Sequence, residues 1–197
     1  EMLRSLVGSE MCIRDSYSVI RSGARSKDYE DALLWLEDAG MIYRIFNISK
    51  PGLPLSAYED PRAFKVYACD CGLLRRLANL PPSTVMSPSA NFTEFKGSLA
   101  ENAILQSLMP LLDNRHPNYW TSENKAEVEF VIQWGERIIP IEVKAENSIS
   151  GRSLGVYTAK YSPEKRIRFS LRNLQYNDGL LSCSSPLAEW FPKLLGL

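Results

Sequence analysis

The sequence predicts a mixed α/β (α+β) fold in which helices flank a β-sheet. Two observations carry this prediction. Apolar side chains recur at helical spacing in residues 26–40, and residues 126–144 contain two alternating, strand-like runs on either side of Gly135-Glu136. The chain has 197 residues, of which 45% are hydrophobic, so it can build one sizeable domain or two small ones.

Composition excludes several function classes. The 23 basic and 23 acidic residues cancel, which argues against a globally basic nucleic-acid binder. No apolar run reaches the roughly 18 residues that a membrane-spanning helix needs, so we expect no membrane partner. Four cysteines in a chain of this size are typical of a reduced protein, and we therefore expect a cytoplasmic location.

Residues 1–16 show no sustained period and no helix cap, and they do not form a secretory signal. The run from Ser5 to Ser16 resembles the translation of a sequencing adapter. We therefore expect residues 1–16 to be non-native and the native protein to begin further upstream. The alternative is a native, frayed terminus.

Residues 17–88 carry the elements of one small module. The expected order is a helix over 26–40, strands over 41–48 and 65–69, a short helix over 73–80, and a linker at 81–83 and 87–89. A helix followed by two strands around a loop is typical of the end of a winged helix. We therefore expect a partial winged helix over residues 17–88.

Residues 89–197 predict a second domain with the order α-β-β-β-α-β. Its expected elements are a helix over 93–112, strands over 118–121, 126–134 and 137–144, a helix over 152–160, a strand over 166–171, and a last amphipathic segment over 187–195. This order indicates a sheet flanked by helices.

The hairpin within this domain brings two carboxylates together. If Gly135-Glu136 forms a two-residue type II′ turn, Glu129 lies directly opposite Glu142, with Cβ atoms about 4.5–5.5 Å apart. Lys144 projects from the same face as Glu142. Two carboxylates this close repel each other unless a positive charge lies between them or one is protonated.

A third carboxylate, Glu101, shares the apolar stripe of the preceding helix with Ile104, Leu105 and Leu108. A cation held by Glu129 and Glu142 would compensate a glutamate on this packing face, and hard oxygen ligands suit Mg²⁺ or Mn²⁺. The alternative is a purely structural salt-bridge face.

Glu101, Glu129 and Glu142-Val143-Lys144 resemble the PD-(D/E)xK signature of the restriction-endonuclease-like superfamily. Together with residues 28–40, 95–102 and 119–144, they make the chain similar to the C-terminal domain of unknown function of prokaryotic AAA-type ATP-binding proteins. The resemblance implies a nuclease-like domain over 89–197 with Glu101, Glu129, Glu142 and Lys144 as catalytic residues. It also implies that Glu129, Glu142 and the Val143 carbonyl are the metal ligands.

In that family an ATPase domain precedes the winged helix. This chain has no Gly-x-x-x-x-Gly-Lys-Ser/Thr loop, so we expect no ATP site within it and a missing upstream ATPase domain as its partner. The sequence departs from the family at Glu129, where the usual residue is Asp. The extra methylene shifts the carboxylate that the metal would need.

A basic strand face, formed by Arg166, Arg168 and Arg172, suggests contact with DNA phosphates; the alternative is a charged edge strand that resists aggregation. Three hypotheses of function follow. The first is metal-dependent hydrolysis of DNA phosphodiesters, the second a catalytically inactive DNA- or protein-binding module of the same ATPase, and the third an oligomerisation domain.

Overall fold

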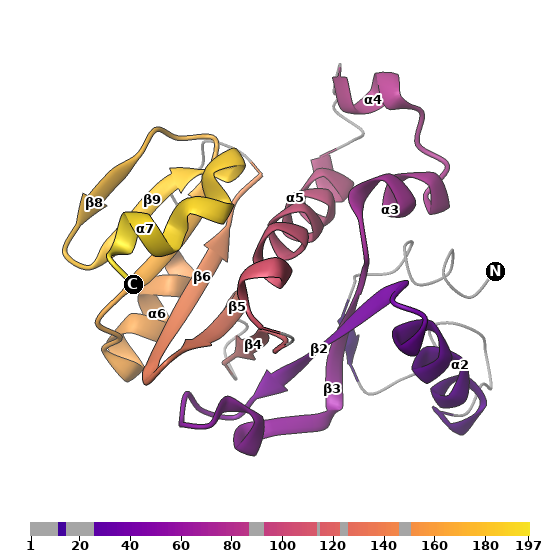
Figure 1. The fold of residues 1–197 in the computed structure, drawn as a ribbon, viewed down its shortest axis with the longest axis horizontal. Coiled ribbons are helices and arrows are strands. Elements are labelled where there is room, and N and C mark those ends of the chain that lie inside the picture. Colours follow the sequence, from indigo (N-terminus) through magenta and orange to yellow (C-terminus); the bar gives the residue numbers. More distant parts are fainter. Residues whose placement is uncertain (1–11, 15–25, 87–92, 114, 123–125, 146–150) are drawn as a thin grey trace.

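The computed structural model describes residues 12–14, 26–86, 93–113, 115–122, 126–145 and 151–197 (Figure 1). Its strands are β1 (Cys12–Arg14), β2 (Ile42–Ile48), β3 (Glu59–Ala68), β4 (Asn118–Thr121), β5 (Glu127–Trp134), β6 (Arg137–Val143), β7 (Arg166–Ser170), β8 (Gln175–Asn177) and β9 (Leu180–Ser184). Its α-helices are α2 (Ser26–Asp38), α3 (Cys71–Leu77), α4 (Pro82–Met86), α5 (Thr93–Leu108), α6 (Arg152–Tyr161) and α7 (Phe191–Leu195). Short 3₁₀ turns are η2 (Leu55–Tyr58), η4 (Met109–Leu111) and η5 (Ser185–Trp190).

One mixed sheet runs through the described residues, with the strand order β1-β3-β2-β4-β5-β6-β7-β9-β8. The two halves of the chain meet where β2 and β4 pair in parallel, with Asn47 opposite Tyr119. The domain boundary predicted between residues 88 and 89 lies outside the described residues. On either side of it, the two halves contribute to the same sheet.

The two faces of this sheet bury different apolar clusters. On one face, α5 and α7 cover the larger cluster, which includes Ile45 and Tyr67 from the first half together with Leu105, Phe130 and Phe191 from the second. On the other face, Tyr157 of α6 packs with Trp120, Val128 and Val131. A core built from both halves explains how strands far apart in the sequence are held in one site.

The mixed α/β class predicted from the sequence is confirmed, whereas the winged-helix and restriction-endonuclease-like folds stay predictions. The β5–β6 hairpin forms in the predicted register, since Trp134 pairs with Arg137 and Phe130 pairs with Ile141. Gly135 has a φ of 60°, which favours glycine and fits the first central position of a type II′ turn.

Two boundaries differ from the prediction for physical reasons. Residues 82–86, expected within a linker, form α4, which begins at a proline that needs no backbone N–H donor there. Residues 87–89 of that linker lie outside the described residues. The long helix ends at Leu108 rather than Leu112, because Pro110 cannot continue the α-helical hydrogen bonding and the chain tightens into η4.

Three strands, β1, β8 and β9, were not predicted at all. The β8–β9 hairpin closes through Asp178-Gly179, both at positive φ, which is a strong hairpin signal in the sequence. At the opposite edge of the sheet, Cys12–Arg14 form β1 and pair with residues 63–65 of β3. These residues lie in the segment that the sequence excludes from the fold. Its non-native origin stays a prediction.

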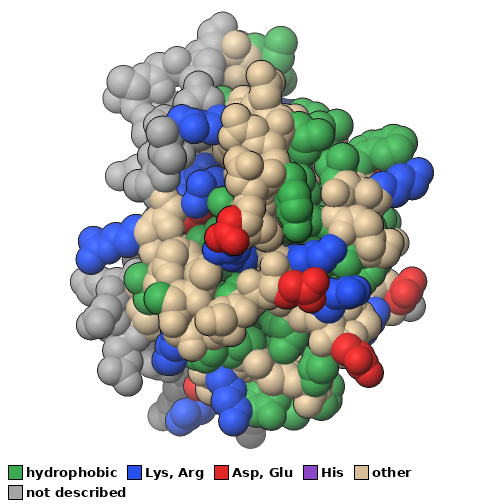
Figure 2. Space-filling model, turned by 90° about the vertical axis from the view of Figure 1, so that its left-hand side faces the viewer, with side chains coloured by type: hydrophobic (Ala, Val, Ile, Leu, Met, Phe, Trp, Pro, Cys, Tyr) green, Lys and Arg blue, Asp and Glu red, His purple; other side chains and the backbone are tan. Residues whose placement is uncertain are grey.

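The side of the molecule that carries β8 and β9 has a mixed surface. Leu171, Leu174, Tyr176 and Trp190 are exposed large hydrophobic side chains. Figure 2 views this side, and basic, acidic and hydrophobic side chains lie interspersed there. Within the described residues, this view therefore does not show a continuous basic stripe.

Candidate active site

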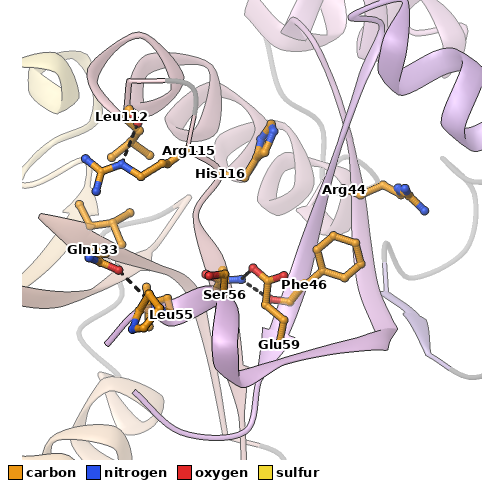
Figure 3. A pocket seen from close by; sticks show the side chains of 12 residues that line it. Arg44, Phe46, Leu55, Ser56, Glu59, Leu112, Arg115, His116 and Gln133 are labelled. Atoms are coloured by element: carbon orange, nitrogen blue, oxygen red, sulfur yellow. Dashed lines mark hydrogen bonds between the residues drawn. The ribbon is translucent and has the colours of Figure 1, made fainter. Parts of the chain in front are cut away.

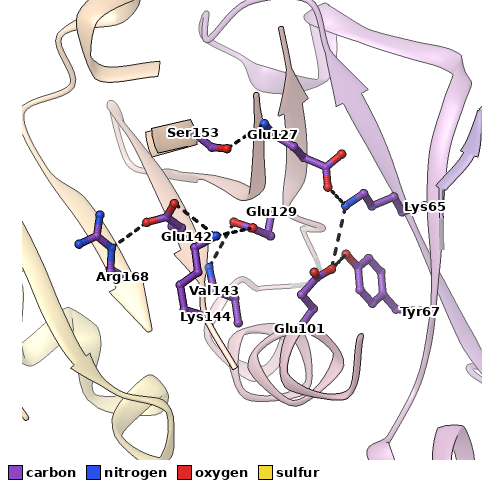
Figure 4. A network of polar contacts seen from close by, with 10 residues as sticks. All are labelled: Lys65, Tyr67, Glu101, Glu127, Glu129, Glu142, Val143, Lys144, Ser153 and Arg168. Carbon is purple, nitrogen blue, oxygen red and sulfur yellow. Dashed lines mark hydrogen bonds and ion pairs between the residues drawn. The ribbon is translucent and has the colours of Figure 1, made fainter. Parts of the chain in front are cut away.

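The hairpin places Glu129 of β5 and Glu142 of β6 on one face, as predicted. Lys144, which follows β6, bridges them: its Nζ lies 3.6 Å from Oε1 of Glu129 and 3.5 Å from Oε1 of Glu142 (Figure 4). The backbone N–H of Val143 donates to Oε2 of Glu129 at 3.2 Å. The two strands thus fix both carboxylates, and Lys144 supplies the positive charge that their proximity requires.

Glu142 is the most deeply buried member of the site, with 0% exposure. The Nε atom of Arg168 donates to its Oε2 at 2.7 Å. Its Oε1 accepts no hydrogen bond within the described part of the chain, although Lys144 lies nearby. A buried carboxylate oxygen without a hydrogen bond is rare in folded proteins and indicates a place for a further ligand or water.

Arg168 comes from the parallel neighbour of β6, since β7 pairs Arg168 with Glu142. The chain leaves room for its guanidinium at Gly151, where a Cβ would lie only 1.8 Å from Nη2 of Arg168. Arg168 is therefore part of the carboxylate site, enclosed between β6 and the start of α6.

Burial has the largest effect on the pKa values of Glu129 and Glu101. It raises the pKa of Glu129 from 4.5 to about 7; Lys144 opposes this shift, and the charges of Glu101 and Glu142 add to it. Burial also raises the pKa of Glu101, against the opposing effects of Lys65 and Tyr67. The site therefore holds more negative charge than its surroundings stabilise.

Glu101 on α5 belongs to the same network but contacts different partners. Tyr67 of β3 donates its hydroxyl to Oε2 of Glu101 at 2.9 Å, and Nζ of Lys65 lies 4.0 Å from the same oxygen. Lys65 also forms an ion pair with Glu127 at the start of β5.

Four carboxylates and three cations of the described residues make up this carboxylate cluster: Glu101, Glu127, Glu129, Glu142, Lys65, Lys144 and Arg168 (Figure 4). Within the described ranges, no three His, Cys, Asp or Glu side chains lie close enough to hold one metal ion together. Glu129 and Glu142 thus remain the candidate ligand pair, with Glu101 set apart beside Tyr67. Val143 contacts Glu129 through its backbone N–H, and its carbonyl as a metal ligand stays a prediction.

The predicted phosphate-contacting face is largely engaged within the protein. Arg168 binds Glu142, and Arg166 binds the carbonyl and carboxylate of Asp178. Both side chains are only 15% exposed. Arg172 lies beyond β7 and is exposed. The alternating pattern correctly indicated a strand, but Arg166 and Arg168 point to partners in the fold.

Sequence reasoning missed Lys65, Tyr67 and Glu127. Glu127 lies two residues before Glu129 in the predicted strand. Because alternate residues of a strand share one face, this spacing could have indicated that Glu127 belongs to the site. Lys65 and Tyr67 lie on a predicted strand but reach the site only because the first half of the chain joins the same sheet. No local pattern signals that pairing.

A separate cavity of about 390 Å³ lies near the other end of β5 (Figure 3). Arg115, His116 and Glu59 contribute charged or polar groups, and Phe46 and Ile132 contribute apolar surface. His116 is exposed there, and its ring lies 5.8 Å from that of Tyr43 between ring centres. The cavity shares no lining residue with the carboxylate cluster.

In the described part of the chain, no helix is both long and apolar enough to cross a membrane. No curated protein and no solved structure matches the chain. Residues 2–84 match the family model described as Domain of unknown function (DUF8612). Residues 96–187 match the model described as Domain of unknown function (DUF4143), which confirms the coarser part of the resemblance: this half of the chain carries a domain of unknown function.

Proposed function

We propose that the carboxylate cluster is a metal-dependent site for the hydrolysis of DNA phosphodiesters. The observation that carries this proposal is the arrangement of Glu129, Glu142 and Lys144. Two carboxylates, at 8% and 0% exposure, lie within 3.6 Å of one lysine amine, in the order and register of the PD-(D/E)xK signature. Such a constellation combines metal ligands with a cation that can act on a phosphate.

The residues present fit a divalent ion. Oε1 of Glu142 is buried without a hydrogen bond, and burial raises the pKa of Glu129 to about 7, a cost that a bound cation would reduce. Oxygen ligands of this kind suit Mg²⁺ or Mn²⁺. When bound, such an ion supplies polarisation of the phosphate and a more acidic bound water.

Lys144 has the best position for a direct role in the reaction. Its side chain is 25% exposed, whereas that of Glu142 beside it is 0% exposed, so Lys144 is more accessible to a substrate than Glu142 is. From there it can orient an attacking water or stabilise negative charge that develops on a phosphate oxygen. Glu101, held by Tyr67, would act through a water rather than as a ligand.

A second candidate function is a catalytically inactive module that binds DNA or a partner protein. The Arg168–Glu142 contact at 2.7 Å favours it, because a guanidinium already neutralises the carboxylate that the ion would need. The presence of Glu129, where the family that the chain resembles usually has Asp, also favours an inactive module. The upstream ATPase domain implied by the resemblance belongs to this second candidate, and an oligomerisation domain stays the third hypothesis.

The nicking of supercoiled plasmid DNA separates the two functions. With Mn²⁺ at pH 8, we expect nicking by the wild type and a loss of at least about 100-fold in Glu142→Gln, which removes a ligand charge. Glu136→Gln, in the exposed turn of the same hairpin, is the matched control and should nick like the wild type. Equal nicking by Glu142→Gln and the control would show contaminating activity and refute the proposal.

A further inference from the structure

Strand β3, in the first half of the chain, presents two polar groups to the carboxylate cluster. Phe64 and Val66 of this strand pack in a cluster with Leu33 of α2. The alternate residues, Lys65 and Tyr67, face the opposite side of the sheet, where Tyr67 joins the core under α5. The alternation of one strand therefore directs a lysine amine and a phenol toward Glu101.

Lys65 is held in this position from several sides. It is 3% exposed, its amine pairs with Glu127 and approaches Glu101 to 4.0 Å, and it lies 5.2 Å from the ring centre of Tyr119. A lysine buried this completely requires carboxylate partners. Its place between two glutamates, one from α5 and one from β5, fixes the distance between those elements.

Glu101 depends on both β3 groups. Tyr67 donates to it at 2.9 Å, and the positive charges that favour its ionised form come from Lys65 and Lys144. The negative charge of Glu127 raises the pKa of Glu101, and so does burial. Without Lys65 and Tyr67, burial and the negative charge of Glu127 would act on the Glu101 carboxyl with less opposition, and its pKa would rise further.

We propose that the catalytic site is composite: Lys65 and Tyr67, from the region that matches one family model, position Glu101 in the region that matches the other. Lys65 and Tyr67 are positioning residues, because they act through Glu101 rather than on a substrate. The inference rests on the proposed function for its catalytic meaning. Its structural content, that Lys65 and Tyr67 hold Glu101 in place and that the charge of Lys65 favours its ionised form, stands on the contacts.

The test compares Lys65→Met, Lys65→Arg and the exposed control Lys193→Met, each first checked for folding by circular dichroism. In metal-free protein, ¹³C NMR titration of the glutamate side chains should show the pKa of Glu101 raised by about one unit in Lys65→Met. Lys65→Arg keeps the positive charge and should therefore show little of this rise, and Lys193→Met should show none. An unchanged Glu101 pKa in folded Lys65→Met would overturn the inference.

Activity provides the second readout. Relative to the wild type at the same pH, Mn²⁺-dependent nicking by Lys65→Met should fall by up to about tenfold at low pH and recover as the pH rises above the shifted pKa, a recovery that a packing defect would not show. If Lys65→Met does not fold, Tyr67→Phe removes only the hydroxyl and should shift the same titration in the same direction; no shift there overturns the inference. Absence of nicking by the wild type refutes the proposed function, whereas the metal-free titration still decides the role of Lys65.

Discussion

Arg168→Met is expected to destabilise the fold at pH 8 by about 3 kcal/mol, because it leaves a buried carboxylate without its guanidinium partner. Glu142 has 0% exposure, and its only other cation within the described residues is Lys144 at 3.5 Å. Methionine preserves much of the volume that the arginine stem fills, so the loss reports charge rather than packing. Urea denaturation monitored by circular dichroism measures the effect.

The matched control is Arg137→Met, which removes an ion pair with Glu164 at 3.4 Å between side chains that are at least half exposed. It should change stability by less than about 0.5 kcal/mol. Equal effects of the two substitutions would contradict the assignment of Arg168 to the site. Arg168→Met also tests function. If Glu142 is a metal ligand that Arg168 otherwise occupies, Mn²⁺ should restore stability to Arg168→Met.

Glu129→Gln is expected to stabilise the metal-free protein at alkaline pH. The pKa of Glu129 is raised from 4.5 to about 7, so the folded state binds its proton more tightly than the unfolded state does. Ionisation of this group therefore lowers stability as the pH rises from about 4.5 to about 7, and the full penalty is present above that range. A shift of this size corresponds to roughly 3 kcal/mol.

The glutamine variant removes this penalty but keeps an oxygen that can accept from the N–H of Val143. We expect a gain of roughly 2 kcal/mol at pH 8 and almost none at pH 5. Thermal melts of Glu129→Gln and of the exposed control Glu136→Gln at both pH values measure it. A loss of stability at pH 8, or a gain that does not depend on pH, would show that Glu129 is stabilised as an anion.

How much of the site is visible in the sequence depends on whether a contact is local. The turn at Gly135-Glu136 fixes the register of one hairpin, and that register places Glu129 and Glu142 together. Arg168 shows the limit. Its alternation with apolar residues predicted a strand, but only the parallel pairing of β7 with β6 places it on Glu142. The pattern alone therefore suggested a surface role.

Lys65 and Tyr67 were out of reach for a related reason. They lie more than 30 residues from Glu101, and their strand reaches the site because its neighbour β2 pairs with β4 and because Asn102 of α5 bonds to the backbone of Ala68 at the end of β3. The sequence favoured two separate modules with a linker between them, and this made such a contact unexpected. The β8–β9 hairpin is the opposite case, because Asp178-Gly179 carries a local signal that could have predicted it.

Calorimetric titration of the metal-free protein with Mn²⁺ at pH 8 tests the metal site most directly. We expect saturable binding by the wild type, retained in Glu136→Gln and weakened at least about tenfold in Glu142→Gln, since a carboxylate ligand is lost. Binding should also release less than one proton per ion at pH 8 and more at pH 6.5, where Glu129 is partly protonated. No binding by the wild type, or binding that is unaffected by Glu142→Gln, would contradict the metal site and leave the inactive binding module as the function.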